Sequence, residues 1–97
     1  MNILQKLEAG ADFQANGKLQ EAQQIYTDIL GREPNNKEAL NLLGILNRDS
    51  GKYEESISFF RQAIEIDEKR ADYHFNLAEV YRLKEQFNMA ISCYSKS

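Results

Sequence analysis

Residues 37–70 read KEALNLLGILNRDSGKYEESISFFRQAIEIDEKR, and this stretch decides the fold. Its first part carries Leu40, Leu43 and Leu46 at steps of three residues, which is the spacing of one face of an α-helix. After the turn residue Gly51 the same period resumes, through apolar residues from Tyr53 to Ile66. Two such helices joined by a short turn predict an antiparallel helix hairpin.

The same pattern occurs three times along the chain of 97 residues, with a period of 34 positions. When the three copies are aligned, small residues share two columns and aromatic residues share a third. These columns are Gly10, Gly44 and Ala78; Ala22, Ser56 and Ala90; and Tyr26, Phe60 and Tyr94. The repeats predict one domain of three units at residues 3–36, 37–70 and 71–97, the third of them incomplete.

The small residues predict where the two helices of each hairpin cross most closely. A residue without bulk lets two helix backbones approach, so we expect Gly44 to lie against Ser56. We expect the aromatic residues one turn further on, Tyr26, Phe60 and Tyr94, to fill the space toward the next unit.

The boundaries between units differ in sequence. Pro34 ends the second helix of the first unit, and Asn35 or Asn36 can cap the helix that follows. Residues 68–70, Glu-Lys-Arg, replace this Pro-Asn-Asn segment at the next boundary, which we therefore expect to be less sharp.

These units resemble the tetratricopeptide repeat family, whose pattern sets Leu-Gly or Leu-Ala, aromatic, small and Pro residues at fixed spacings. The matching residues are Gly10, Phe13, Ala22, Tyr26 and Pro34 in the first unit; Leu40, Leu43, Gly44, Ser56, Phe60 and Ala63 in the second; and Leu77, Ala78, Tyr81, Ala90 and Tyr94 in the third. The resemblance implies an all-α fold, a right-handed superhelix of antiparallel helix hairpins. It also implies that the first helix of each hairpin lines a concave groove.

Composition and charge exclude several classes of protein. A net charge of −3, from 12 basic and 15 acidic residues, gives no electrostatic footprint for nucleic acid or an anionic membrane. No segment is apolar enough to cross a bilayer, and the N-terminus lacks the pattern of a signal peptide. The single Cys93 forms no internal disulfide, which fits a reducing compartment, and we expect a cytoplasmic location.

Residues that could carry chemistry are scattered along the chain. His74 and Cys93 are the only His and Cys, whereas a metal site needs three or four ligands, so we predict no metal and no cofactor. The sequence also lacks a glycine-rich phosphate loop and any nucleophile with an accompanying base. We therefore predict that the chain is not an enzyme.

By the resemblance, one stripe of each first helix lines the groove and meets the ligand. The residues that we predict to bind a peptide are Asn41, Ile45, Arg48, Phe75, Asn76, Glu79 and Arg82. Apolar side chains rimmed by charges and amides suit an extended or helical peptide. We expect Arg48 and Arg82 to pair with acidic groups of the ligand, and Asn76 to bond a peptide group.

Two ligand modes of the family can be compared with this sequence. Chaperone-binding members hold a C-terminal carboxylate with Lys, Asn and Arg, and four of the five matching positions lack that chemistry. The five matching positions are Leu7, Ala11, Leu42, Asp72 and Asn76. We therefore predict no carboxylate clamp. Asn76 matches the asparagine ladder of O-linked N-acetylglucosamine transferases, whereas Leu42 and Glu8 do not.

The sequence thus predicts a scaffold that binds a protein or peptide, and it leaves two alternatives open. The repeats could be the N-terminal, substrate-recruiting segment of a larger enzyme such as a glycosyltransferase or methyltransferase. They could also associate with another copy through the C-terminal helix face, where Ala90, Ile91 and Tyr94 have no following hairpin.

Overall fold

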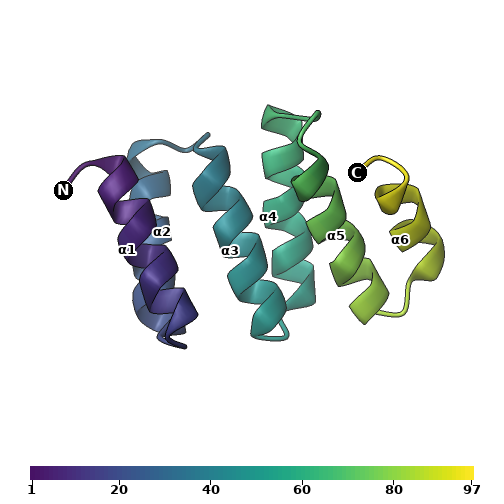
Figure 1. The fold of residues 1–97 in the computed structure, drawn as a ribbon, viewed down its shortest axis with the longest axis horizontal. Helices are drawn as coiled ribbons and strands as arrows, with labels where there is room; N and C mark the ends of the chain where they lie inside the picture. Colours follow the sequence, from purple (N-terminus) through teal and green to yellow (C-terminus); the bar gives the residue numbers. More distant parts are fainter.

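The computed structural model describes residues 1–97 and contains six α-helices and no strand. The helices are α1 (Ile3–Ala15), α2 (Leu19–Arg32), α3 (Lys37–Asp49), α4 (Tyr53–Ile66), α5 (Ala71–Leu83) and α6 (Phe87–Tyr94). They form three antiparallel pairs that succeed one another along the 41 Å axis of the molecule (Figure 1). The predicted all-α solenoid of helix hairpins is confirmed.

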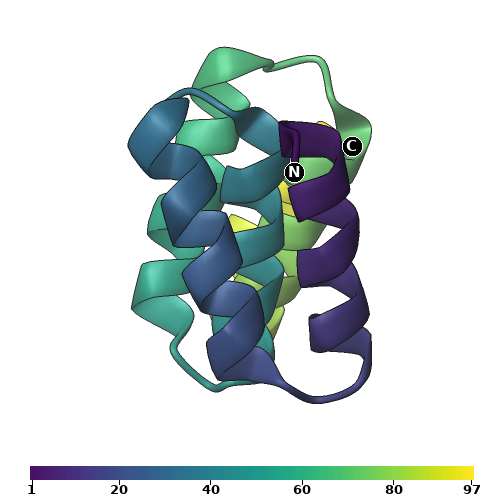
Figure 2. The same cartoon turned by 90° about the vertical axis from the view of Figure 1, so that its left-hand side faces the viewer.

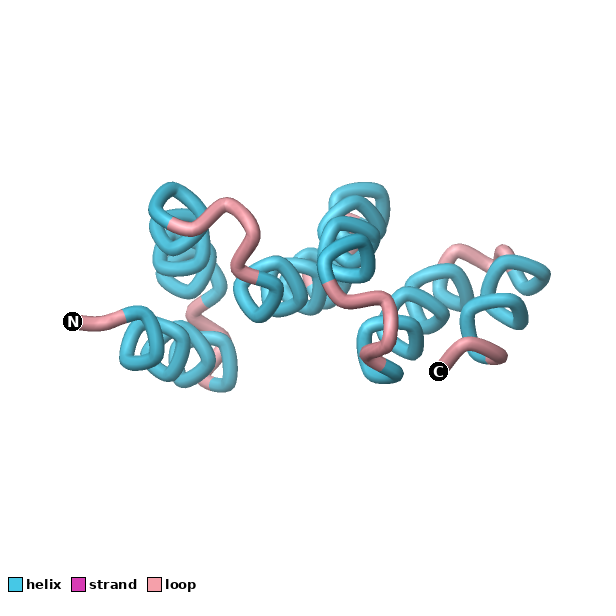
Figure 3. The backbone as a smooth tube through the Cα atoms, turned by 90° about the horizontal axis from the view of Figure 1, so that it is seen from above, coloured by secondary structure: helices cyan, strands magenta, loops and turns pink.

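Each helix packs on its partner in the pair, and the second helix of each pair also packs on the first helix of the next. Figure 2, seen from the N-terminal end, shows α1 and α2 side by side in front of the later pairs. Seen from above in Figure 3, α1, α3 and α5 lie on one side of the molecule, and α2 and α4 lie on the other. None of the six helices combines the length and apolar character that a membrane crossing requires.

The turn inside each pair has the same geometry in all three units. The N–H groups of Lys18, Lys52 and Gln86 each donate to a carbonyl five residues earlier, at 2.8 Å. This closure requires a residue with positive φ just before the donor. Gly17 and Gly51 occupy that place at +76° and +79°, and Glu85 occupies it at +61° in the third unit.

Aromatic rings lie directly over two of the predicted close-approach residues. A Cβ atom built on Gly44 would lie 2.4 Å from Cε1 of Phe60, and one built on Gly10 would lie 2.5 Å from Cε1 of Tyr26. The Ser56 hydroxyl does reach Gly44, since it donates to the Gly44 carbonyl oxygen at 2.6 Å. The ring of Phe60, more than Ser56, is therefore what requires a glycine at position 44.

The second boundary, which we expected to be less sharp, differs from the first in its capping and not in its length. Residues 33–36 and residues 67–70 are connections of equal length. Asn36 caps α3 by accepting the Ala39 N–H at 2.9 Å, whereas Arg70 gives α5 no side-chain cap. Ion pairs hold the second boundary instead. Arg70 bonds Glu38 of α3 and Asp72 of α5, each at 2.9 Å, and Lys37 bonds Asp67 at 2.7 Å.

Candidate functional site

The seven predicted binding residues lie on two neighbouring first helices, α3 and α5, which contact each other directly. Asn41, Ile45 and Arg48 recur at steps of four and three residues along α3. Such residues share one face of a helix. Phe75, Glu79 and Arg82, 34 positions later, occupy the corresponding stripe of α5, and Asn76 lies next to it.

An amide pair joins the two helices. Nδ2 of Asn76 donates to Oδ1 of Asn41 at 3.0 Å. Asn41 is only 7% exposed, while Asn76 is half-buried. The Asn76 side chain keeps its oxygen and its second N–H free of partners within the chain, so it still offers one acceptor and one donor.

Phe75 forms an aromatic contact beside this pair. Its ring centroid lies 5.8 Å from that of Tyr94, at an interplanar angle of 56°. Phe75 remains 48% exposed, although the contact with Tyr94 restrains its ring. A large aromatic side chain held in this way can bury much apolar area at a small cost in conformational entropy.

Charged residues continue the surface toward the C-terminal end of α5. Arg82 donates to both carboxylate oxygens of Glu79 at 3.2 Å, and the Tyr94 hydroxyl donates to the same carboxylate. The hydrogen bond from Arg82 and then that from Tyr94 hold the pKa of Glu79 below its usual range. Glu79 is therefore ionised at neutral pH.

The two arginines that we expected to meet acidic ligand groups already have carboxylate partners. Arg48 Nε lies 3.2 Å from Asp49, and Arg82 pairs with Glu79. Both pairs are solvent-accessible, and such pairs contribute only about 0–1 kcal/mol. A ligand carboxylate can consequently replace either partner at little cost.

Ile45 and Tyr94 depart from their expected environments. Ile45 is half-buried and packs against the cluster of Ile57 and Phe60, so most of it belongs to the core. Tyr94 was expected to fill the space toward a further unit, yet it reaches Phe75 and Glu79 on α5. A sequence signal for this exists. Ala78 stands where the first two units have glycine, so a methyl group occupies the place that an aromatic ring takes over Gly10 and Gly44.

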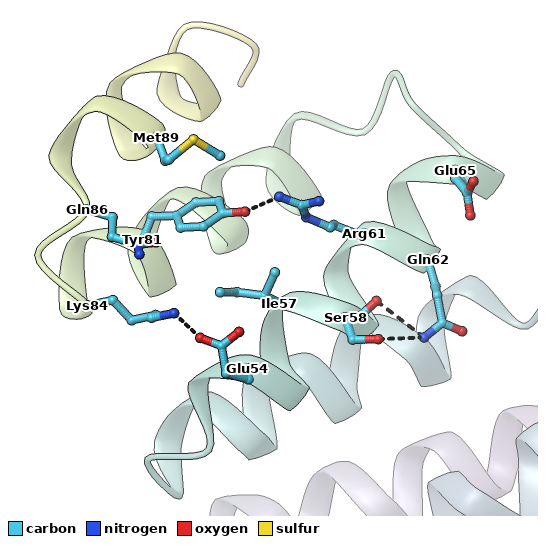
Figure 4. Close-up of a pocket in the computed structure, with 10 residues that line it drawn as sticks. All are labelled: Glu54, Ile57, Ser58, Arg61, Gln62, Glu65, Tyr81, Lys84, Gln86 and Met89. Atoms are coloured by element: carbon cyan, nitrogen blue, oxygen red, sulfur yellow. Dashed lines mark hydrogen bonds and ion pairs between the residues drawn. The ribbon is translucent and has the colours of Figure 1, made fainter.

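The α3–α5 surface is open. The largest hollow in the structure, of about 680 Å³, lies elsewhere, among side chains of α4, α5 and α6 (Figure 4). None of the seven predicted residues lines any of the five hollows found in the structure. No three His, Cys, Asp or Glu side chains lie close enough together to hold a metal ion.

Comparison with known proteins identifies related repeats over nearly the whole chain. Two tetratricopeptide repeat models match residues 7–71 and 71–97. A probable UDP-N-acetylglucosamine–peptide N-acetylglucosaminyltransferase SPINDLY of Hordeum vulgare is 30% identical over 95 residues. That match covers 91% of this chain and only 10% of the barley protein.

Solved structures show the same arrangement of helices. An O-GlcNAc transferase of Thermobaculum terrenum superposes with a TM-score of 0.92 at 29% identity, over 97% of this chain and 18% of that one. The second repeat domain of Spaghetti (RPAP3), bound to the HSP90 peptide SRMEEVD, superposes with a TM-score of 0.89 at 19% identity. That match covers 97% of this chain and 87% of the RPAP3 chain.

Proposed function

The chain belongs to the tetratricopeptide repeat family, and we propose that it is a non-catalytic scaffold that binds a protein or peptide segment across α3 and α5. The same proposal includes three repeat units, at residues 3–36, 37–70 and 71–97. It also includes a cytoplasmic location.

The observation that carries the proposal is the exposed ring of Phe75 beside unsatisfied polar groups. Phe75 supplies an apolar anchor, and the neighbouring Asn76 supplies a free acceptor and donor at the spacing of a peptide group. Glu79 and Arg82 add a charged rim that disfavours ligands of the wrong charge pattern. Together these groups suit a peptide with one large apolar residue.

The peptide complex of the RPAP3 domain supports this reading of the fold, because a chain of very similar shape binds a peptide. The ligand chemistry differs here. Asp72 stands at one of the positions where carboxylate-binding members have a cation, and its contact with Arg70 keeps the pKa of Asp72 below its usual range. Arg70 is shared between Asp72 and Glu38, so one negative charge remains in excess there and disfavours a C-terminal carboxylate. The proposed ligand is therefore an internal segment.

A second candidate function is substrate recruitment within a larger glycosyltransferase. The barley relative and the Thermobaculum terrenum structure favour it, since both are similar over nearly all of this chain. The chain spans about a tenth of the length of the barley protein, so catalysis would lie outside the residues described. Reading the gene beyond Ser97 tests this candidate, and a stop codon at that point would remove it.

Self-association is a third candidate. Of the predicted face, Ala90 is buried and Tyr94 is half-buried, whereas Ile91 is 65% exposed and lies one turn from Phe87, which is 57% exposed. Adjacent exposed apolar side chains of this kind favour contact with another copy. Sedimentation equilibrium at increasing concentration measures it directly. A monomer throughout would exclude self-association and leave the peptide proposal unaffected.

Selection of peptides from a display library, with the folded chain as bait, tests the main proposal. Phe75→Ala should weaken the binding of selected peptides by about 1–2 kcal/mol, which is about 5- to 30-fold in Kd. Phe87→Ala is the matched control, because it removes a similarly exposed phenylalanine from another surface. Equal losses from both variants, or none from Phe75→Ala, would show that peptides bind elsewhere.

A further inference from the structure

We propose that the cleft between α4 and α6 is a second binding site, for a protein segment that carries an apolar side chain next to a carboxylate. The cleft lies apart from the α3–α5 surface, and the proposal is independent of the function assigned to that surface.

The cleft exists because the backbones of α4 and α6 do not approach each other closely. Each packs on α5, which forms the floor between them. Two adjoining hollows, of about 680 and 510 Å³, share Arg61, Glu65, Tyr81 and Met89 in their lining. Figure 4 shows side chains from all three helices around the larger hollow. Volumes of this size accommodate several side chains of a ligand.

The floor of the cleft is apolar. Ile57, Leu77 and Tyr81 are nearly buried, at 8%, 6% and 4% exposure. Met89 of α6 projects beside them and is 44% exposed. Methionine adapts its shape to an incoming group, so the floor can receive an apolar side chain without a rigid fit.

A fixed guanidinium group lies at the centre of the cleft. Arg61 donates to the Tyr81 hydroxyl, and its Cζ lies 6.0 Å from the centroid of the Tyr81 ring. No carboxylate of the chain forms an ion pair with Arg61, and its other N–H groups have no partner within the chain. A guanidinium held in place with free N–H groups is well suited to bind a carboxylate at two points.

The distribution of paired charges separates this cleft from the α3–α5 surface. Arg48, Arg70 and Arg82 all have carboxylate partners. Unpaired cations border the cleft instead, because Lys96 lines the smaller hollow and Lys69 lines an adjoining one with it.

Carboxylates also border the cleft and offset part of its positive charge. Glu54 is neutralised by Lys84. Within the two hollows that form the cleft, Glu65 remains unpaired against Arg61 and Lys96, which leaves an excess of one positive charge. In a chain whose net charge is −3, this local excess favours an acidic segment over a basic one.

The preceding units do not repeat the cleft. No hollow is lined jointly by α2 and α4. The positions that correspond to Arg61 and Tyr81, 34 residues earlier, are Thr27 and Asn47, and Asn47 bonds the Leu43 carbonyl oxygen of its own helix. The arginine–tyrosine pair is thus a feature of this surface and is not required by the repeat.

Fluorescence anisotropy with a labelled probe tests the proposal. The probe is a short peptide with the sequence Asp-Asp-Leu-Phe-Glu-Asp, and the reference probe replaces its acids by Asn and Gln. We expect saturable binding of the acidic probe. Arg61→Gln should weaken it by at least about tenfold, because the variant loses a charge-assisted hydrogen bond to the carboxylate. Arg32→Gln is the matched control, since Arg32 is exposed on α2 without an ion pair.

A second pair of variants tests the apolar floor. Met89→Ser should also weaken the acidic probe, while Ile66→Ser should not, because Ile66 is similarly exposed, at 40%, and lines no hollow. Four results would overturn the proposal: no saturable binding, equal binding of the amide probe, equal losses from Arg61→Gln and Arg32→Gln, or binding lost with Phe75→Ala in place of Arg61→Gln. The last of these would support the α3–α5 surface instead.

Discussion

Replacing Gly44 by alanine tests whether the Phe60 ring sets the approach of α3 to α4. The added Cβ would lie 2.4, 2.6 and 2.8 Å from Cε1, Cδ1 and Cζ of the ring. Phe60 is fully buried in a cluster with Leu77 and Val80 of α5, so its ring cannot retreat without moving the next unit. Gly31, in the last turn of α2, is the matched control because a Cβ there would meet nothing within 4 Å.

Both substitutions gain helix propensity, but only Gly44→Ala also overpacks the core. Alanine is a better helix former than glycine by about 1 kcal/mol, so Gly31→Ala should increase the free energy of unfolding by about 0.5–1 kcal/mol. At Gly44 that gain is offset by an overpacking cost of about 1–3 kcal/mol. The net result should be a loss of up to about 2 kcal/mol. Leucine at Gly44 should cost more than alanine, because more atoms must displace the ring.

Urea unfolding followed by far-ultraviolet circular dichroism measures both variants. The difference between them should be about 1–3 kcal/mol, and each kcal/mol corresponds to about 4–8 °C in Tm for a domain of this size. Adding Phe60→Leu should reduce the penalty at Gly44, since the smaller side chain vacates the space. Equal stabilisation by both alanines would refute the assignment of the Phe60 ring as the obstacle.

Three further changes test other features of the structure. Glu85→Gly should stabilise the chain by about 1 kcal/mol, because Glu85 holds the left-handed conformation that glycine adopts without strain; thermal unfolding measures the gain, and a lower Tm would contradict it. The pKa of Glu79 is lowered by its bonds to Arg82 and Tyr94, so its stabilisation is complete above the ordinary pKa of a glutamate and is lost as the pH falls through the lowered value. Glu79→Gln should therefore reduce stability at neutral pH and weaken its dependence on acid, as measured by urea unfolding over a pH series; an unchanged pH dependence would exclude this role. Ser56→Ala should cost about 0.5–1.5 kcal/mol through the lost bond to the Gly44 carbonyl, and a neutral result in the same unfolding assay would show that the bond contributes nothing.

The sequence predicted the helix pairs because their cause is local. The period of Leu40, Leu43 and Leu46 defines a buried face within one helix, and Gly51 provides the turn that follows. These features need no knowledge of distant residues.

The features that the sequence did not predict depend on contacts between residues that are distant in the chain. Arg70 secures the second boundary by bonding Glu38, which is 32 positions earlier in the chain. Tyr94 turns to Phe75 and Glu79, which lie 19 and 15 positions earlier in the chain. Periodicity identifies the face on which a residue lies, but not which charged or aromatic partner it meets there.

Titration of the isotope-labelled chain with a library-selected peptide, followed by amide chemical shifts in NMR spectra, tests peptide binding across α3 and α5 most directly. The proposed function predicts the largest shifts at Phe75, Asn76 and Glu79, together with the side-chain amides of Asn41 and Asn76. The largest shifts on α2, or in the α4–α6 cleft alone, would contradict it.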